Sequence, residues 1–354
     1  MKKIVVLVLL SIFLAFFSSS IVSLSYPEEN VLCLNIYPKI HPQLYSPSYF
    51  LWGSSKYERA TDFVLDRAGN IYIVGEVNLA PLNTDILLVK LDANGNELWN
   101  RTWGGSREDI GRGIALANDG SIYIVGSYYA RSGNIYQLDL VLMKWNSNGN
   151  LIWTRTWERY FGSWENGYGI TISEDGDIYT IGDSDGDLIL IKWDSYGRHH
   201  WTQILESENY IATQGLAIAE DDNDYIYTLG TISRHFGGLN TFDDFLLVKW
   251  DATGQQLWNR TWGSNNFESP TGLCVSANGS IYTIGERFLN NGGINTVLVR
   301  WDIEGNQIWN NTLEDVEGAE VITANNSIYT IGSTVSWEEQ PDSILIKWEN
   351  DGRI

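Results

Sequence analysis

The residue types most suited to chemistry in this sequence are a run of carboxylates, four histidines and several glutamates. The run Asp183-Ser-Asp185-Gly-Asp187 alternates carboxylates over a short stretch, which suits Ca²⁺. It lacks the distant bidentate glutamate that completes a calcium loop, so a short acidic turn explains it as well. We therefore treat Ca²⁺ at Asp183, Asp185 and Asp187 as a hypothesis and expect no other cofactor.

The remaining reactive residues form no recognisable motif. His41, the adjacent His199 and His200, and His235 are not at the spacing of metal ligands. The sequence contains no Gly-x-Ser-x-Gly elbow, phosphate loop or His-Glu-x-x-His motif. Its two cysteines are far apart in the sequence and neither belongs to a Cys-x-x-Cys pair. The sequence thus gives no positive sign of catalysis.

The elements that would position such residues come from a repeat. The phrase Ile-Tyr-x-x-Gly occurs six times, at 71–75, 122–126, 178–182, 226–230, 281–285 and 328–332. A period of about fifty residues is typical of a propeller blade.

Each repeat predicts four strands: a short apolar strand after a glycine, the Ile-Tyr-x-x-Gly strand, a continuous apolar strand, and a strand carrying tryptophan. Turns rich in Gly, Asn and Asp separate the first strand from the second and the third from the fourth. We therefore predict an all-β, six-bladed β-propeller of four-stranded antiparallel blades. The sixth repeat lacks its fourth strand, and we expect the N-terminal strand that contains Trp52 to complete it and remove a free edge.

Most of the 16 tryptophans belong to the repeat. Only Trp164 and Trp337 lie outside the predicted third, fourth and closing strands. Tryptophans that recur with the repeat are expected to pack the blades rather than to bind a ligand.

The repeats resemble the bacterial and archaeal β-propeller repeat called SBBP, from about Trp52 to the C-terminus. The pattern Asp-x-x-Gly-x-x-x-Trp at 92–99, 194–201, 251–258 and 302–309 also resembles the tryptophan-docking turn of quinoprotein-like repeats. The SBBP name implies seven blades, whereas six copies are present and residues 26–48 contain none. We predict six blades, with seven as the alternative. The vicinal cysteines and the haem-attachment motif of quinoproteins are absent from the sequence.

The N-terminal segment has the pattern of an export signal. Lys2 and Lys3 precede a continuous apolar or small run, and Ser23 and Ser25 suit a cut before Tyr26. The apolar stretch is also close to the length of a membrane span, so an uncleaved anchor is the alternative. We predict a signal or anchor at 1–25, a stalk at 26–48 and the propeller at 49–354, in a secreted or cell-surface protein.

The balance of charge limits the class of partner. With 23 basic and 44 acidic residues, the net charge is -21, which repels nucleic acid and anionic lipid. We expect no nucleic acid partner, no membrane contact except through an uncleaved anchor, and a monomer.

The predicted loops divide into two rims. Short, uniform turns join the first strand to the second and the third to the fourth. Long, irregular segments, here called the variable rim, join the second to the third and link successive blades. Recognition residues accumulate on loops held by a rigid scaffold, so the variable rim is the predicted binding face. Its candidate residues are Tyr128, Tyr129, Arg131, Tyr160, Trp164, Glu165, His235, Phe236, Arg287, Phe288 and Trp337.

Three functions fit these observations. The first is an exported, non-catalytic scaffold that binds or adheres to a protein or glycan through the variable rim. The second is a glycan-active hydrolase or lyase that uses a carboxylate pair of suitable separation. Its candidate carboxylates are Glu165, Glu208, Glu268 and Glu286. The third is a scaffold subunit of an envelope complex. The missing catalytic motifs favour the first.

Overall fold

The structure is a computed structural model in which the described residues are all β-strand, turn or loop. The described residues are 4–6, 20–25, 33–38, 50–52, 57–132, 135–206, 213–235, 241–290, 292–324, 327–334 and 342–354. Within these ranges, no helix is long and apolar enough to cross a membrane.

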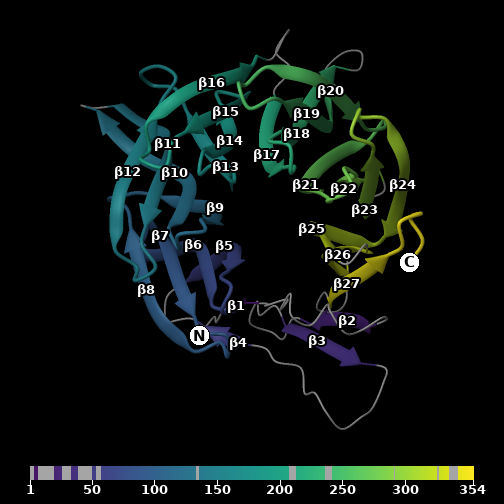
Figure 1. The fold of residues 1–354 in the computed structure, drawn as a ribbon, viewed down its shortest axis with the longest axis horizontal. Helices are drawn as coiled ribbons and strands as arrows, with labels where there is room; N and C mark the ends of the chain where they lie inside the picture. Colours follow the sequence, from purple (N-terminus) through teal and green to yellow (C-terminus); the bar gives the residue numbers. More distant parts are fainter. Residues whose placement is uncertain are drawn as a thin grey trace. The chain divides into compact units, whose positions relative to one another are not determined.

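The chain divides into two compact units. One contains Trp52–Ile218, and the other contains Val5–Leu51 and Ala219–Ile354. Among the described residues, five four-stranded sheets consist of strands whose neighbours in the sheet follow one another in sequence, as the labels in Figure 1 show. Such meanders need only short turns, which explains the even spacing of the Gly- and Asn-containing segments.

The first unit contains three four-stranded sheets. The first sheet is β5 (Glu58–Leu65), β6 (Ile71–Ala80), β7 (Asn83–Leu91) and β8 (Glu97–Trp103). The second is β9 (Ile110–Leu116), β10 (Ile122–Ser132), β11 (Ile135–Trp145) and β12 (Leu151–Trp157). The third is β13 (Glu165–Ile172), β14 (Ile178–Ser184), β15 (Asp187–Trp193) and β16 (His199–Leu205).

The next sheets repeat this order. The unit boundary falls within β17 (Thr213–Glu220), which is followed in its sheet by β18 (Ile226–His235), β19 (Thr241–Trp250) and β20 (Gln256–Trp262). The fifth sheet is β21 (Phe267–Val275), β22 (Ile281–Phe288), β23 (Ile294–Trp301) and β24 (Gln307–Glu314). The described residues thus contain six sheets built on the repeat, which agrees with the six predicted blades.

The sixth sheet differs from the prediction at its edge. Its strands β25 (Val316–Ala324), β26 (Ser327–Thr334) and β27 (Asp342–Trp348) are followed by β2 (Ser20–Ser25) and β3 (Cys33–Pro38). The strand with Trp52, β4 (Phe50–Trp52), instead pairs with β1 (Ile4–Val6). The expectation that the Trp52 strand adds to β27 is therefore wrong.

This difference arises because pairing between strands depends on backbone hydrogen bonds and hardly on the side-chain sequence. The sequence of β2 is Ser-Ile-Val-Ser-Leu-Ser, which has no similarity to the repeat, and Val22 is opposite Leu345 in the pairing with β27. Backbone hydrogen bonds at a strand edge accept any extended segment. Similarity to the repeat therefore did not decide which N-terminal segment pairs there.

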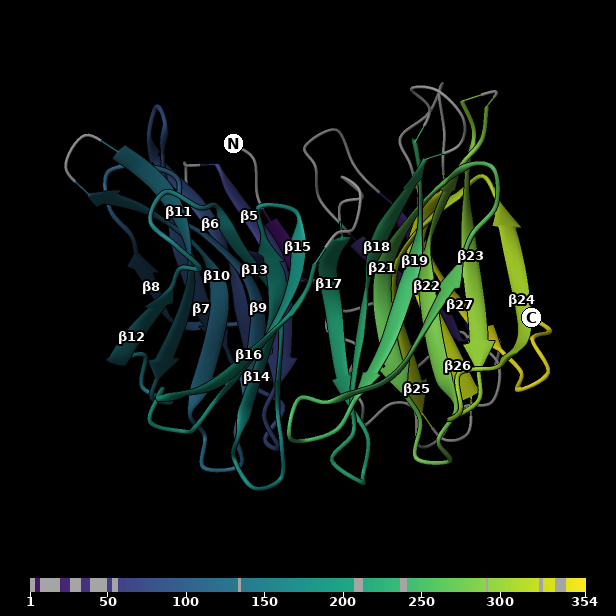
Figure 2. The same cartoon turned by 90° about the horizontal axis from the view of Figure 1, so that it is seen from above.

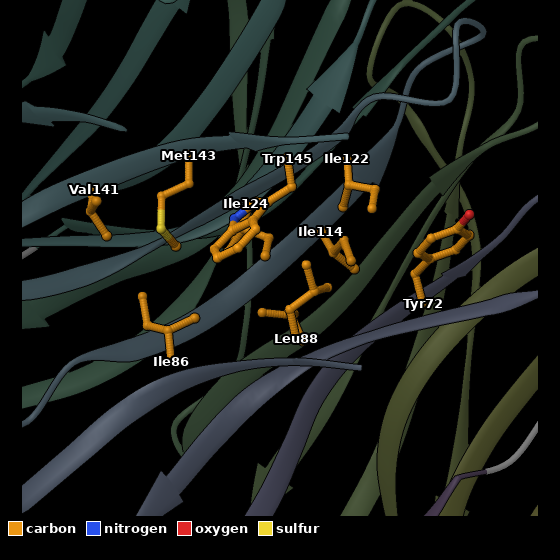
Figure 3. Packing of buried hydrophobic residues seen from close by; sticks show 10 residues of the cluster. Tyr72, Ile86, Leu88, Ile114, Ile122, Ile124, Val141, Met143 and Trp145 are labelled. Carbon is orange, nitrogen blue, oxygen red and sulfur yellow. The ribbon is translucent and has the colours of Figure 1, made fainter. Parts of the chain in front are cut away.

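Packing between sheets explains the continuous apolar third strands. In β7, Ile86 and Leu88 are both about 1% exposed. Figure 3 shows them pointing toward Ile124 of β10 and Met143 of β11, which are fully buried. Alternate residues of the strand pack on its two sides, so every position is apolar.

Within the first five of these sheets, the repeated tyrosine and tryptophan pack on each other. Tyr123 lies 5.9 Å from Trp153 between ring centroids, and the Lys144 ammonium lies 5.0 Å from the centre of the Tyr123 ring. The same layering recurs at Tyr72, Tyr179 and Tyr227. The recurring basic residue of the third strand thus covers the tyrosine ring.

Successive sheets are joined by the turn that the sequence predicted as tryptophan-docking. Gly197 packs on Trp153 of the preceding sheet, and its carbonyl accepts a hydrogen bond from Arg155 Nε at 3.1 Å. The Arg155 guanidinium also lies 5.0 Å from the centre of the Trp153 ring. Equivalent contacts join Gly149 to Trp99, Gly305 to Trp258 and Gly352 to Trp309. These tryptophans are packing residues.

The buried tryptophan at the end of the third strand also has a repeated partner. Its indole N–H donates to a threonine hydroxyl in the pairs Trp193–Thr180, Trp250–Thr228, Trp301–Thr283 and Trp348–Thr330. In the second sheet, Ile124 takes the place of this threonine, and the Trp145 indole nitrogen has no hydrogen-bond partner.

Candidate functional site

The variable rim is most fully built between the second and third sheets of the first unit. Figure 2 shows this unit from above, with its turns gathered at the two ends of the strands. The loop between β12 and β13 contains three large exposed side chains: Tyr160 is 54% exposed, Phe161 58% and Trp164 48%.

The acidic β14–β15 hairpin holds this loop in place. Asp185 Oδ1 accepts a hydrogen bond from the Trp164 backbone N–H at 3.1 Å, and Oδ2 accepts one from the Tyr160 hydroxyl at 2.5 Å. The Asp185 N–H donates in turn to the Trp164 carbonyl at 3.0 Å. Asp185 has a φ of 48°, and Gly186 follows at 86°, as a tight hairpin turn requires.

The first residues of the loop are tied by ion pairs. Arg159 Nη1 lies 2.5 Å from Asp187 Oδ2, and Nη2 lies 2.9 Å from Glu206 Oε1. The hydrogen bond to Asp187, the largest cause, raises the pKa of Arg159, so its charge is retained at all ordinary pH values.

Buried polar groups support the loop from below. Gln137 is 4% exposed, donates to Glu158 Oε2 at 2.6 Å, and accepts from the Gly162 N–H at 3.0 Å. Glu165 is fully buried, and its Oε1 accepts from the Ser184 hydroxyl at 2.9 Å. Burial raises the pKa of Glu165, and its Oε2 has no hydrogen-bond partner.

A second group of aromatic residues meets the loop from the β10–β11 hairpin. Trp164 packs edge-on against Tyr129, with ring centroids 6.0 Å apart and planes at 86°. Tyr129 also contacts Tyr136 at 6.0 Å, and the Arg107 guanidinium lies 4.0 Å from the centre of the Tyr136 ring. The buried Asp109 accepts from the Tyr129 N–H at 2.8 Å.

We call Tyr129, Tyr136, Tyr160, Phe161 and Trp164 the aromatic platform. The described parts of the loops that contribute to it are held by buried or paired polar groups. A surface so held orders few side chains when a ligand binds, so it loses little conformational entropy on binding.

The predicted rim residues divide into several groups. Tyr129, Tyr160, Trp164 and Glu165 come together as described. Tyr128 packs against Trp103 of the first sheet at 5.2 Å and belongs to the core. The backbone alone is described at Arg131 and His235, and Phe236 and Trp337 lie outside the described residues.

Sequence reasoning missed Arg107. It lies in the Gly104-Gly105-Ser-Arg107 connection between β8 and β9, which is part of the variable rim by its position. Nothing in its local sequence indicates that its guanidinium stacks on tyrosines from the β10–β11 hairpin.

The three aspartates considered for Ca²⁺ each interact with different residues of the protein. Asp183 interacts with Asn166 and Tyr168, Asp185 with Tyr160 and Trp164, and Asp187 with Arg159. Their arrangement therefore favours the acidic-turn interpretation. In the described part of the chain, no group of His, Cys, Asp and Glu is placed to hold a metal ion.

The second unit contains the remaining rim candidates. Arg287 pairs with Glu268, which is fully buried, at 2.9 Å, and its guanidinium lies 5.1 Å from the centre of the Trp262 ring. Phe288 is 38% exposed. Arg287 thus makes its ion pair and its ring contact with residues of the protein itself. We therefore assign it a role in stabilising the end of its sheet.

Among the candidate carboxylates, Glu286 has the most perturbed environment. Burial, and secondarily the neighbouring Glu317 charge, raise the pKa of Glu286 to about 7. Glu286 lies on β22 and Glu317 on β25 of the next sheet, and these strands are in contact. Glu208 lies outside the described residues.

Comparison with known proteins identifies the fold. Neither a protein family nor a curated protein matches the sequence. Among solved structures, an ulvan lyase, a polysaccharide lyase bound to -[GlcA(1-4)Rha3S]-, has a TM-score of 0.60 at 11% identity, over 94% of this chain and 91% of that chain. A protein from Lactobacillus plantarum has a TM-score of 0.58 at 11% identity, over 93% and 96%.

The WD40 domain of Neurospora crassa Pan2 is also similar, with a TM-score of 0.51 at 10% identity, over 81% of this chain and 88% of that chain. These likenesses, together with the four-stranded antiparallel sheets, show that the chain has a β-propeller type of fold. At such low identity they show the fold alone, and function has to be argued from the site.

Proposed function

We propose that this protein is an exported, non-catalytic scaffold that binds a protein or glycan through its variable rim. The observation that carries the proposal is the aromatic platform. Three of its side chains are about half exposed, although each loop beneath them is fixed by hydrogen bonds or ion pairs. Exposed tryptophan and tyrosine on a rigid surface are typical of binding hot spots.

The contrast with the repeated tryptophans supports this interpretation. Trp153 and Trp309 are covered by the docking glycine of the following turn. Trp164 has no such cover, and its edge-on contact with Tyr129 leaves 48% of it exposed. A residue that served only to pack the sheets would be expected to be buried.

The proposal predicts that single changes in the platform weaken binding without unfolding the protein. Pull-down from the native envelope, together with a glycan array, would identify the ligand. Trp164→Ala and Phe161→Ala should then weaken its binding by a factor of ten or more, about 1.4 kcal/mol or above. Their midpoint of thermal unfolding should stay close to that of the parent, because both side chains are exposed.

Tyr196→Ala is the matched control. Tyr196 is 66% exposed and lies in the short turn between β15 and β16, on the uniform rim. Its loss should leave binding unchanged. If Trp164→Ala and Phe161→Ala bind every ligand as the parent does, the platform is not the binding site.

A glycan-active enzyme is the second candidate, favoured by the environment of Glu286. A carboxyl group with a pKa of about 7 beside a second carboxylate suits a general acid. Glu286→Gln should then abolish turnover of a polysaccharide found on the array, and product analysis would detect it. Binding without turnover would leave the scaffold function as the better account.

A further inference from the structure

Four exposed carboxylates border the aromatic platform. They are Glu108, Glu158, Asp185 and Glu206. Asp185 accepts a hydrogen bond from the Trp164 N–H of the β12–β13 loop, Glu158 belongs to that loop and accepts one from Gln137 of β11, and Glu206 is 72% exposed beside Arg159. Glu108 lies in the β8–β9 connection, directly after Arg107. We call these four residues the acidic border.

Two guanidinium groups are described at this place, and one of them is paired with carboxylates while the other stacks on tyrosine rings. Arg159 is shared between Asp187 and Glu206 at 2.5 and 2.9 Å. The Arg107 guanidinium is stacked 4.0 Å from the centre of the Tyr136 ring and 5.4 Å from that of Tyr129. Among the described side chains, the four border carboxylates and Asp187 outnumber the two guanidiniums, so the platform lies in a negative field.

A ligand that covers the platform has to match both its exposed aromatic side chains and the negative charge around them. Its apolar part would remove Phe161 and Trp164 from water, and its charged part would lie among carboxylates. An anionic glycan or an acidic peptide would bring like charges together, which costs free energy and slows association. The net charge of -21 acts in the same direction at longer range.

Basic side chains meet both requirements. Lysine and arginine carry a long apolar stem, can pair with the border carboxylates, and can lie over the exposed faces of Tyr160 or Trp164. We propose that the partner of the variable rim is a basic protein segment, with an apolar or aromatic side chain on Phe161 and Trp164 and lysine or arginine side chains against the acidic border. This inference rests on the proposed binding function.

Defined peptides test it. Three sets of 15-residue synthetic peptides share a central Trp-Leu pair and differ in whether the flanking residues are Lys and Arg, Glu, or Ser and Gln. Binding to the full chain is followed by biolayer interferometry. We expect the basic set to bind and to lose about tenfold in affinity between 50 and 500 mM NaCl, because salt screens exposed charges. The other two sets should not bind.

Two double variants separate the local field from the net charge. Glu108→Gln with Glu206→Gln should weaken the basic peptides by about threefold to tenfold and flatten the salt dependence. Glu174→Gln with Asp175→Asn removes the same number of charges from the exposed turn between β13 and β14, on the uniform rim, and should change nothing. Trp164→Ala should abolish peptide binding.

The outcomes are distinct. Equal binding of the three sets, binding of the acidic or neutral set alone, or no binding of the basic set would overturn the inference. If a neutral or anionic ligand from the envelope or the glycan array still requires Trp164, the binding function stands and the basic partner is wrong. If no ligand depends on Trp164, both are wrong.

Discussion

Asp62 occupies a position in the first strand of its sheet where the next two sheets have Gly113 and Gly169. Its Oδ2 accepts a hydrogen bond from the Ile114 N–H of the second sheet at 3.0 Å. Burial raises the pKa of Asp62 from 3.8 to about 6, although two backbone N–H groups oppose this effect. The Asp62 carboxylate thus links two sheets. Its charge is partly removed from water, which lowers the stability of the folded protein.

Asp62→Asn should therefore stabilise the protein in a pH-dependent way. The folded pKa lies above the unfolded one, so the charge destabilises the fold fully above pH 6 and not at all below pH 3.8. The asparagine has one acceptor oxygen, so it can keep the hydrogen bond from the Ile114 N–H or the one from the Phe63 N–H, but not both, and this loss is the same at every pH. We expect the stability of the variant relative to the parent to rise by on the order of 2 kcal/mol from pH 4 to pH 8, measured by urea denaturation at each pH.

Asp92→Asn is the control, because the charge of Asp92 stabilises the fold whereas that of Asp62 destabilises it. Hydrogen bonds from Asn96, the largest cause, lower the pKa of Asp92, so this carboxylate stabilises the fold above its unfolded pKa. The substitution should give no gain at pH 8. A gain at pH 8 in both variants would mean that relief of the overall negative charge, rather than the site of Asp62, explains the effect.

At the scale of the element, the docking turn is the device that joins successive sheets. Gly197 has a φ of 73°, and a Cβ atom there would lie 2.9 Å from Trp153. The position thus requires glycine for two reasons, the left-handed backbone and the contact with the indole. The first could be predicted from the Asp-x-x-Gly pattern, whereas the second depends on how two sheets pack.

Gly197→Ala should be more destabilising than a change at an ordinary left-handed glycine. Gly176→Ala is the matched control, because Gly176 has a φ of 85° and no atom lies within 4 Å of its added Cβ. We expect about 1 kcal/mol of destabilisation at Gly176 and about 2–3 kcal/mol at Gly197 by urea denaturation. Equal losses would mean that the indole moves aside and that docking contributes little.

At the scale of the whole molecule, the excess of carboxylates governs solution behaviour. The chain has 44 acidic and 23 basic residues, and its sequence pI is about 4.5. Net charge far from zero keeps copies apart at neutral pH. The carboxylates that border the platform belong to this excess, and they are the basis of the basic partner that we propose for the rim.

Solubility should pass through a minimum close to pH 4.5 and rise steeply toward pH 7. Static light scattering from pH 3.5 to 8 in low salt would measure it. Trp164→Ala should leave the position of the minimum unchanged, because it removes no charge. A minimum near neutral pH, shifted by Trp164→Ala, would instead mean that self-association through the platform dominates.

The sequence by itself determined the strands of the six repeats, their order in the first five of the repeat sheets and the packing roles of the repeated Tyr72, Trp99 and their equivalents. These follow from local periodicity, because a meander pairs each strand with its neighbour in sequence. Only the tertiary structure decided that Tyr129, Trp164 and Asp185 meet at one place, since they come from separate hairpins and loops. It also decided that β2 rather than the Trp52 strand lies beside β27, because a backbone edge pairs with any extended segment within reach.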